Sequence, residues 1–234
     1  MNTDTIIWDF DGTLLPLTPY DSEQTLMLHK LDEAAPMDEA APRPPYFVRA
    51  LARLLIGADR RQMFRKTFKR FYIRLMKGTP MAVMDQVGRR LSGRISSEDR
   101  QTILHLKSEN YRMMVLSCGT ADLSERTLKM AELGDCFESV AGNRFNISRG
   151  RINGMTLHIP NPVDKVKWIT NMGISADDAI AVGDGYTDIP LLDWAKIPVL
   201  VDRSGKKRIK YKHKNYRFIS STSEILDVLD DEGV

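Results

Sequence analysis

Two aspartates, Asp9 and Asp11, stand two residues apart at the end of a short apolar run, and Gly12 follows them directly. The run at 4–8 is typical of a buried strand, which would deliver both carboxylates to the sheet edge where open α/β folds bind ligands. At such an edge one aspartate can act as a nucleophile and the other as a proton donor, while a bound cation offsets their repulsion. The pattern therefore predicts phosphoryl-transfer chemistry with this pair as the catalytic residues.

A second strand end carries a hydroxyl group where a phosphate could bind. Ser117, Cys118 and Gly119 follow the apolar run 113–116. The serine hydroxyl and successive backbone N–H groups suit phosphoryl oxygens, and Gly119 permits a tight bend. Taken alone, a serine between a strand and a helix is more often an N-cap. The segment is therefore a candidate phosphate-binding loop that depends on the other motifs for support.

A third strand end carries carboxylates suited to a metal ion. Asp184 lies between two glycines after the apolar run 179–182, and Asp188 follows four residues later. Mg²⁺ prefers oxygen ligands and keeps several waters, so one or two carboxylates, a carbonyl oxygen and the substrate suffice to bind it. In isolation the same residues could form a simple turn between a strand and a helix. The aspartate pair at the first strand end favours the metal site.

A lysine at the start of an expected helix completes the set. Lys165 opens the helix expected at 164–172, whose N-terminal end would face the same sheet edge. Near a phosphate, its charge would neutralise the nucleophile and hold the transferring group. In isolation a lysine there is normally a solvated surface residue, and Lys167 is a rival for the role.

Strands and helices alternate along the C-terminal half of the chain, which defines the expected fold. Runs typical of buried strands occur at 113–116, 139–141, 179–182, 199–201 and 216–219, and 145–157 has the pattern of a hairpin. This alternation predicts an α/β fold with a doubly wound parallel sheet and right-handed crossovers. Strand 4–8 would join that sheet, so the helical block after it is an insertion. We predict a core domain of 1–16 and 106–234 and an all-helical cap domain of 17–105.

In this order the four motifs resemble those of the haloacid dehalogenase superfamily. They stand as Asp9-Phe10-Asp11-Gly12-Thr13, Ser117, Lys165 and Gly183-Asp184-Gly185-Tyr186-Thr187-Asp188. The second aspartate resembles the phosphatase branch, and the helical insertion is similar to the C1 cap of the family. The most similar group is the phosphoserine phosphatase-like branch, with further support from Ala141-Gly142-Asn143-Arg144-Phe145 and from the lysine motif at 165–169.

The resemblance implies a Mg²⁺-dependent phosphomonoester phosphatase that acts on a small phosphorylated metabolite. Asp9 would attack phosphorus and form an aspartyl-phosphate, and Asp11 would protonate the leaving alcohol and then activate water. The implied phosphate-binding residues are Ser117, Cys118 through its backbone amide, Gly119 and Lys165. The implied Mg²⁺ ligands are Asp9, the backbone carbonyl of Asp11, and Asp184, with Asp188 and Gly185 supporting from behind.

Recognition of the leaving group is where the chain departs from the group that it resembles. Phosphoserine phosphatases follow the first motif with a cap glutamate that reads the substrate ammonium group, and the corresponding position here is Thr18. Asp21 or Glu23 could substitute, although their register differs. Arg65 and Tyr186 are further candidates for substrate contacts. The substrate therefore stays open at this level.

Charge is unevenly distributed along the chain, whose net charge is +3. Residues 43–78 hold eleven Lys/Arg and one acid, and 203–214 hold seven Lys/Arg and no acid. The segment 60–77 predicts a cap helix with a solvated cationic face, or a surface that attracts an acidic substrate, a nucleotide or an anionic membrane. Its aromatics share one helical face, which favours core packing over stacking on nucleic-acid bases. The segment 203–214 is expected to be a surface loop.

Two alternatives to hydrolysis follow from these features. A phosphotransferase or mutase would use the same aspartyl intermediate, and a binding module would use the basic segment 60–77 with a vestigial site. No apolar run approaches the length of a membrane span, and Asp4 stands where a signal peptide would carry a basic residue. Two cysteines, Cys118 and Cys136, suggest reduced thiols and a cytoplasmic location. The oligomeric state is left open.

Overall fold

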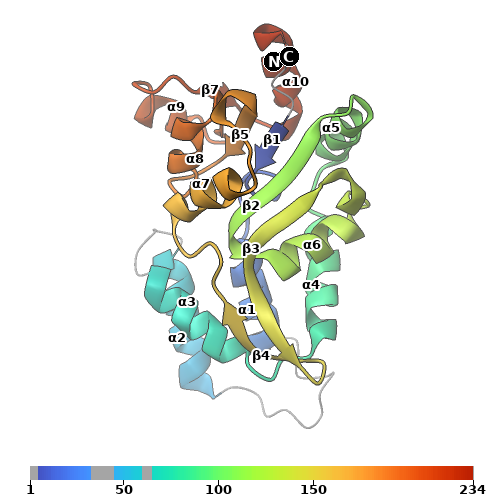
Figure 1. The fold of residues 1–234 in the computed structure, drawn as a ribbon. Helices are drawn as coiled ribbons and strands as arrows, with labels where there is room; N and C mark the ends of the chain where they lie inside the picture. The colour runs from blue at the N-terminus through green and yellow to red at the C-terminus, as the bar shows by residue number, and fades with distance from the viewer. Residues whose placement is uncertain (1–4, 33–44, 60–64, 234) are drawn as a thin grey trace.

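The computed structural model describes residues 5–32, 45–59 and 65–233. A seven-stranded sheet in the order β4-β3-β2-β1-β5-β6-β7 forms its centre (Figure 1). The strands are β1 Thr5–Trp8, β2 Arg112–Thr120, β3 Ser139–Ser148, β4 Arg151–Thr156, β5 Ala179–Gly183, β6 Ile197–Val201 and β7 Arg217–Ile219. All neighbours pair in parallel except β3 and β4, which form an antiparallel hairpin. The expected parallel α/β sheet is therefore confirmed.

The first strand lies in the middle of this sheet, and both of its faces are buried. Successive side chains point to opposite faces. Ile6 and Trp8 pack into the cluster on one side, and Ile7 packs into the cluster on the other. A strand buried on both faces needs a continuous apolar run, as in covered parallel sheets. The sequence of β1 meets that requirement.

Helices cover both faces of the sheet, as a doubly wound fold requires. One face is covered by α5 Ser97–Ser108, α6 Ala121–Met130 and α10 Ile225–Glu232. The other face is covered by α7 Pro162–Asn171 and α8 Ile189–Trp194. Figure 1 shows the two sets of helices on opposite sides of the strands. The remaining short elements are α9 Lys206–Lys210, η1 Gly134–Cys136, η2 Ala176–Asp178 and η3 Thr222–Glu224.

A block of helices is inserted between β1 and β2, and part of it lies beyond one end of the sheet. Before α5 the block contains α1 Ser22–Asp32, α2 Tyr46–Asp59, α3 Arg65–Met76 and α4 Met81–Ser92. Figure 1 shows α1, α2 and α3 gathered at the lower end of the molecule. This is the helical content expected of a cap, while α4 packs along α6 and α5 packs against η1 and η3 of the core. The boundaries 17 and 105 of the cap stay a prediction.

The β3–β4 hairpin connects the core to the cap. Its turn lies at Arg149 and Gly150, both with positive φ, as the sequence predicts. Ile152 of β4 accepts a hydrogen bond from the Gly78 amide at 2.8 Å and donates one to the Thr79 carbonyl at 2.9 Å. These bonds attach the end of α3 to the hairpin. The cap is therefore anchored by main-chain hydrogen bonds as well as by packing.

The aromatic face of α3 packs inward, in agreement with the core interpretation of its periodicity. Phe68 and Tyr72 are buried, with their rings stacked at 6.2 Å, and Tyr72 also contacts Phe145 of β3. Phe71 is partly buried against the same cluster, and Phe64 lies outside the described residues. Of the cationic side chains of this helix, Lys66, Arg70 and Arg74 are exposed, whereas Lys69 is largely buried and pairs with Glu23. Within the described ranges, the structure contains no helix with the length and apolar character needed to cross a membrane.

Candidate active site

Three neighbouring strands bring the sequence motifs to one edge of the sheet. Asp9 follows β1, Ser117 lies near the end of β2, and Asp184 follows β5. In the sheet register Trp8 is paired with Val115 on one side and with Val182 on the other. The three motifs must therefore meet, because they leave adjacent parallel strands at the same level. β2 continues to Thr120, which is four residues beyond the expected run 113–116.

Lys165 is a buried cation between two carboxylates. Its side chain is 0 % exposed, and its Nζ lies 2.6 Å from Asp9 Oδ1 and 2.6 Å from Asp188 Oδ1. Burial opposes the charge, but attraction by Asp188 and Asp9 outweighs it and holds the pKa of Lys165 above its ordinary value. The rival Lys167 is 70 % exposed and pairs with Asp164 at 3.0 Å. The structure thus brings Lys165 to the site and leaves Lys167 at the surface.

Asp188 fixes the loop that carries the third motif. Its Oδ2 accepts hydrogen bonds from the backbone amides of Asp184 at 3.0 Å and Gly185 at 2.9 Å. The residue before them must be glycine, because a Cβ on Gly183 would lie 2.4 Å from Asp188 Cβ. With its other oxygen on Lys165, Asp188 orients both the loop and the lysine. Asp188 and Gly185 thus lie behind Asp184, and their supporting role stays a prediction.

Asp184 lies against the first motif and against an unexpected lysine. A Cβ on Gly12, whose φ is +95°, would lie 2.2 Å from Asp184 Cγ, so only glycine permits this close approach. Asp184 Oδ2 accepts a hydrogen bond from Lys207 Nζ at 2.7 Å. Lys207 belongs to α9, and nearby Arg203 donates to the Thr13 carbonyl at 2.9 Å.

The segment 203–214 is therefore more than the surface loop expected from its composition. It contains a helix, and two of its cations reach residues of the catalytic motifs. Its abundance of lysine and arginine indicated an attraction to acids. Nothing in the sequence indicated that the acid would be Asp184 of the same chain, because the contact spans 23 residues.

Three carboxylates at this edge form a group that could hold a metal ion. Oxygens of Asp9, Asp184 and Asp188 lie within 4.8 Å of one another. Both Asp188 oxygens already accept hydrogen bonds, whereas Asp9 Oδ2 and Asp184 Oδ1 accept none from the part of the chain that the structure describes. Burial, and then the charge of Asp188, raise the pKa of Asp9, and burial raises that of Asp184. Carboxylate oxygens that accept no hydrogen bond, on largely buried residues, fit a hard divalent cation, which would stabilise their ionised forms.

Asp11 points away from this cluster and toward the cap. Ser22, the first residue of α1, donates its backbone amide to Asp11 Oδ1 at 2.7 Å and its hydroxyl to Asp11 Oδ2 at 2.7 Å. Burial raises the pKa of Asp11 to about 6, although the two Ser22 donors oppose the rise. A carboxyl group with such a pKa can donate and accept a proton near neutral pH. Its position depends on the cap, because its hydrogen-bond donors belong to α1.

The expected phosphate loop is buried at the end of β2. Ser117 Oγ accepts a hydrogen bond from the Gly119 amide at 2.9 Å. The carbonyl of Cys118 accepts one from Asn143 Nδ2 at 2.8 Å, and Asn143 Oδ1 accepts one from the Ile159 amide at 3.1 Å. Burial raises the pKa of the Cys118 thiol, which fits a residue that contributes its backbone rather than a thiolate. In the sequence Asn143 is visible only as part of the motif 141–145, whereas the structure shows that its side chain fixes this loop.

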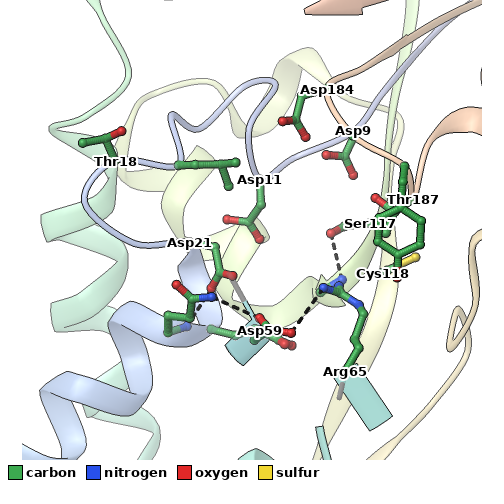
Figure 2. A pocket seen from close by; sticks show the side chains of 16 residues that line it. Asp9, Asp11, Thr18, Asp21, Asp59, Arg65, Ser117, Cys118, Asp184 and Thr187 are labelled. Atoms are coloured by element: carbon green, nitrogen blue, oxygen red, sulfur yellow. Dashed lines mark hydrogen bonds and ion pairs between the residues drawn. The ribbon is translucent and has the colours of Figure 1, made fainter. Parts of the chain in front are cut away.

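The site opens into a cavity of about 320 Å³ between the sheet edge and the cap. Figure 2 shows Asp9, Asp184 and Ser117 on its core side, with Asp21, Asp59 and Arg65 on its cap side. All five residues suggested for specificity line it: Thr18, Asp21, Glu23, Arg65 and Tyr186. Gln24 and Asp59 also line it and were missed. Asp59 had a signal, because it is the one acid within 43–78.

The cap carboxylates differ in how well they are paired. Glu23 accepts hydrogen bonds from Lys69 at 2.6 and 2.7 Å and from the Thr120 hydroxyl at 2.6 Å, so it links α1, α3 and β2. Asp59 accepts one from Gln24 at 3.0 Å and lies 3.8 Å from Arg65, but its buried Oδ1 has no hydrogen-bond donor among the residues that the structure describes. Burial raises the pKa of Asp59, with Arg65 opposing. Glu23 is therefore fully engaged within the protein, while Asp59 is paired less completely.

Comparison with known proteins places this fold and site in a family. A family model described as haloacid dehalogenase-like hydrolase matches residues 6–193. The chain therefore belongs to the haloacid dehalogenase-like hydrolase family, as the motifs suggested. This result covers the sheet edge with all four motifs and the helices inserted after β1.

Two curated relatives carry the name phosphoserine phosphatase. The relative from Archaeoglobus fulgidus is 25% identical over 198 residues, which cover 81% of this chain and 56% of that protein. The relative from Lactococcus lactis subsp. lactis is 24% identical over 167 residues, which cover 68% of this chain and 74% of that protein. This chain thus matches little more than half the length of the archaeal relative.

Solved structures share the fold at low identity. A substrate-bound phosphoserine phosphatase complex has a TM-score of 0.67 at 18% identity, with 99% of both chains covered. A phospho-aspartyl intermediate analogue of phosphoserine phosphatase has a TM-score of 0.66 at 20% identity, covering 97% of this chain and 99% of that one. These likenesses confirm the architecture of core and helical cap.

Proposed function

We propose that the chain is a Mg²⁺-dependent phosphatase that hydrolyses a small phosphomonoester through an aspartyl-phosphate on Asp9. The observation that carries the proposal is the contact of Lys165 with Asp9, which lines the same cavity as Asp11, and the pKa of Asp11 is raised to about 6. The family supports hydrolysis, and relatives named phosphoserine phosphatase support a phosphorylated substrate.

In the first step the carboxylate of Asp9 attacks phosphorus in line with the leaving oxygen. An oxygen–phosphorus bond forms to Asp9 while the bond to the leaving group breaks, and Asp11 gives its proton to the departing alcohol. The non-bridging oxygens are held by Lys165, the Ser117 hydroxyl and the Gly119 amide. Such preorganised donors act strongly in a buried site.

In the second step a water molecule attacks the phosphorus of the aspartyl-phosphate. Asp11, now ionised, accepts the proton of this water, and the bond between phosphorus and Asp9 breaks. Inorganic phosphate leaves, and both aspartates return to their starting states. One carboxyl group can serve as acid and then as base because its pKa lies near neutral pH.

Asp9, Asp184 and the backbone carbonyl of Asp11 would hold Mg²⁺, with Asp188 orienting the loop behind Asp184. When bound, the ion neutralises charge on the phosphoryl oxygens. The ligands are hard oxygen donors, which match the preference of Mg²⁺.

The leaving group would face the cap side of the cavity. Glu23 is engaged by Lys69 and Thr120. We therefore assign recognition of the leaving group to Asp21, Asp59 and Arg65. Thr18 and Tyr186 line the margins of the cavity. A cavity of about 320 Å³ suits a small metabolite. Phosphoserine is one test compound among several, since the cap glutamate expected at position 18 is absent.

The test is phosphate release from a panel of phosphoserine, phosphocholine-like amines, nucleotides and sugar phosphates, with and without Mg²⁺. We expect release in water without an added acceptor, and its loss on removal of the ion by a chelator. Asp9→Asn should abolish turnover and leave the circular dichroism spectrum unchanged, because asparagine retains an acceptor for Lys165. Near-normal turnover by this variant would refute the proposal, and release only with an alcohol acceptor would indicate a phosphotransferase.

A further inference from the structure

A second cavity lies beside the catalytic one, between α3 and the loop that follows β4. Its volume is about 360 Å³, and it shares Arg65 and Cys118 with the catalytic cavity. One side of α3 supplies four cations to its wall: Arg65, Lys66, Lys69 and Arg70. The facing wall comes from Leu157, Pro160 and Asn161 of the core. The two cavities are thus neighbours along the boundary between cap and core.

The charges of this cavity are only partly compensated. No acid stands among its lining residues in the described part of the chain. Lys69 pairs with Glu23, and Arg65 lies near Asp59. These two acids line the first cavity, which contains Asp9. Lys66 and Arg70 make no ion pair or hydrogen bond through their side chains with any described residue. Two exposed cations therefore face a hollow without a protein partner.

The walls of the cavity strengthen its field. A concave surface lined by one sign of charge, with apolar walls, focuses the potential and raises the local concentration of counter-ions. Ile73, Leu157 and Pro160 supply such walls here. A phosphate or carboxylate group offers the acceptor oxygens that lysine and arginine donors require. The cavity has the charge, donors and volume to hold one acidic group.

We propose that this basic cavity binds the phosphate or carboxylate group of an acidic ligand, with Lys66 and Arg70 as its principal donors. The ligand can be the substrate itself, and this case rests on the proposed phosphatase function. The phosphomonoester of the substrate then lies at Asp9, and its second acidic group reaches past Arg65 into the basic cavity. If the ligand is a free organic acid, it occupies the cavity beside the substrate. Both sources present the same chemistry to the same residues.

The first measurement compares two substrates that differ by one acidic group. Glycerol 3-phosphate and 3-phosphoglycerate have the same carbon skeleton, but only the second carries a carboxylate. The double variant Lys66→Gln, Arg70→Gln should raise KM for 3-phosphoglycerate by about tenfold or more, since a hydrogen bond to a charged group contributes that much. KM for glycerol 3-phosphate should stay the same. The matched control is Arg74→Gln, an exposed cation of α3 outside the cavity.

The second measurement needs no turnover. Calorimetry with succinate, a dicarboxylate without phosphorus, should show binding to the unchanged protein and to Arg74→Gln but not to the double variant. Succinate binding with unaltered KM values assigns the cavity to a free acid, whereas a selective KM change assigns it to the substrate. Identical behaviour of the double variant and Arg74→Gln in both measurements would overturn the proposal. If the protein releases phosphate from no compound, the phosphatase proposal fails, and succinate binding still decides the cavity.

Discussion

The two walls of the catalytic cavity are built on different principles. On the core wall, Asp188 uses both carboxylate oxygens on protein donors, and Lys165 is held between it and Asp9. On the cap wall, Asp59 has a buried oxygen with no donor among the described residues. The core wall is thus held together by a buried cation between two carboxylates, and its open oxygens, on Asp9 and Asp184, are those that suit a metal ion, whereas the open oxygen of the cap wall belongs to a single carboxylate that faces Arg65.

This difference assigns the two parts of a reaction to two parts of the molecule. Parallel strands fix where Asp9 and Asp184 lie, because their ends are bound together by the sheet register. Helices of the cap contribute side chains from separate turns, so their contacts can vary without disturbing the sheet. Ionisable groups in a cavity whose pKa values are strongly shifted are typical of functional sites. This difference supports the proposal that the core would perform the chemistry and the cap would select the leaving group.

The largest effect is expected from removing the cation of the core wall. Lys165→Met should lower the free energy of unfolding by about 3–5 kcal/mol, because it leaves two buried carboxylates without their partner. It should also abolish turnover. Urea unfolding measures the first effect, and phosphate release measures the second.

The matched control is Lys167→Met on the same helix, whose lysine is exposed and pairs only with Asp164. It should change stability by about 0.5 kcal/mol or less. Equal losses in the two variants would show that the core wall does not depend on the buried cation.

The next effect tests the residue that lies between the two walls. Asp11→Asn should lower turnover of alkyl phosphates by about 10²–10⁴-fold, because asparagine cannot transfer the proton. p-Nitrophenyl phosphate has a leaving group that needs little protonation, so the first step should survive and the second should stall. Rapid-mixing absorbance should then show a burst of about one nitrophenol per enzyme, with phosphate left on Asp9.

Asp21→Asn is the control for this variant, since Asp21 lies in the same cavity and caps α1 by accepting from the Gln24 amide at 2.7 Å. Asparagine is an equally good cap, so the helix should persist. This control should show no burst. A burst in both variants, or in neither, would contradict the role of Asp11 as acid and base.

The smallest effect is expected on the cap wall. Asp59→Asn should raise the free energy of unfolding at neutral pH by about 0.5–2 kcal/mol. Gains of this size are common when a substitution at a functional position stabilises the folded protein. Burial raises the pKa of Asp59 in the folded protein above its unfolded value. The ionised carboxyl therefore costs stability above the folded pKa, and this cost disappears below the ordinary value of about 4, where both states are protonated.

Urea unfolding at about pH 7 and about pH 4 measures this difference, which should shrink at the lower pH. Asp85→Asn is the control, because Asp85 is 52 % exposed and pairs with Arg126 at 2.9 Å. A loss of stability in Asp59→Asn at neutral pH would show that Asp59 is a structural ion pair with Arg65. The contrast between the walls would then disappear.

Much of the fold and part of the site follow from local patterns in the sequence. The apolar run before Asp9 predicts a central strand because only a doubly buried strand tolerates it. The Gly-Asp-Gly pattern at 183–185 predicts a close approach of backbone to side chain, and Gly183 and Gly12 make that approach. The hairpin turn at Arg149 and Gly150 was likewise visible in the residues themselves.

The choice between similar residues was not visible in the sequence. Lys165 and Lys167 lie two positions apart, and only the packing of α7 against the sheet buries the first and exposes the second. The role of Lys207 depends on how α9 returns to the sheet edge. Such pairings join segments distant in the chain, so no local pattern records them.

By itself the sequence determined the sheet edge, the paired aspartates and the family, because each rests on residues that are close neighbours in the chain. Tertiary structure alone decided which lysine meets Asp9, which cation faces Asp184, and which cap carboxylate has an oxygen with no donor among the described residues. The physical reason is range: backbone conformation depends on nearby residues, whereas the pairing of buried charges depends on how whole helices pack. Local patterns therefore predict the strand ends that carry the motifs, whereas the contacts between buried charges follow only from the packing of whole helices.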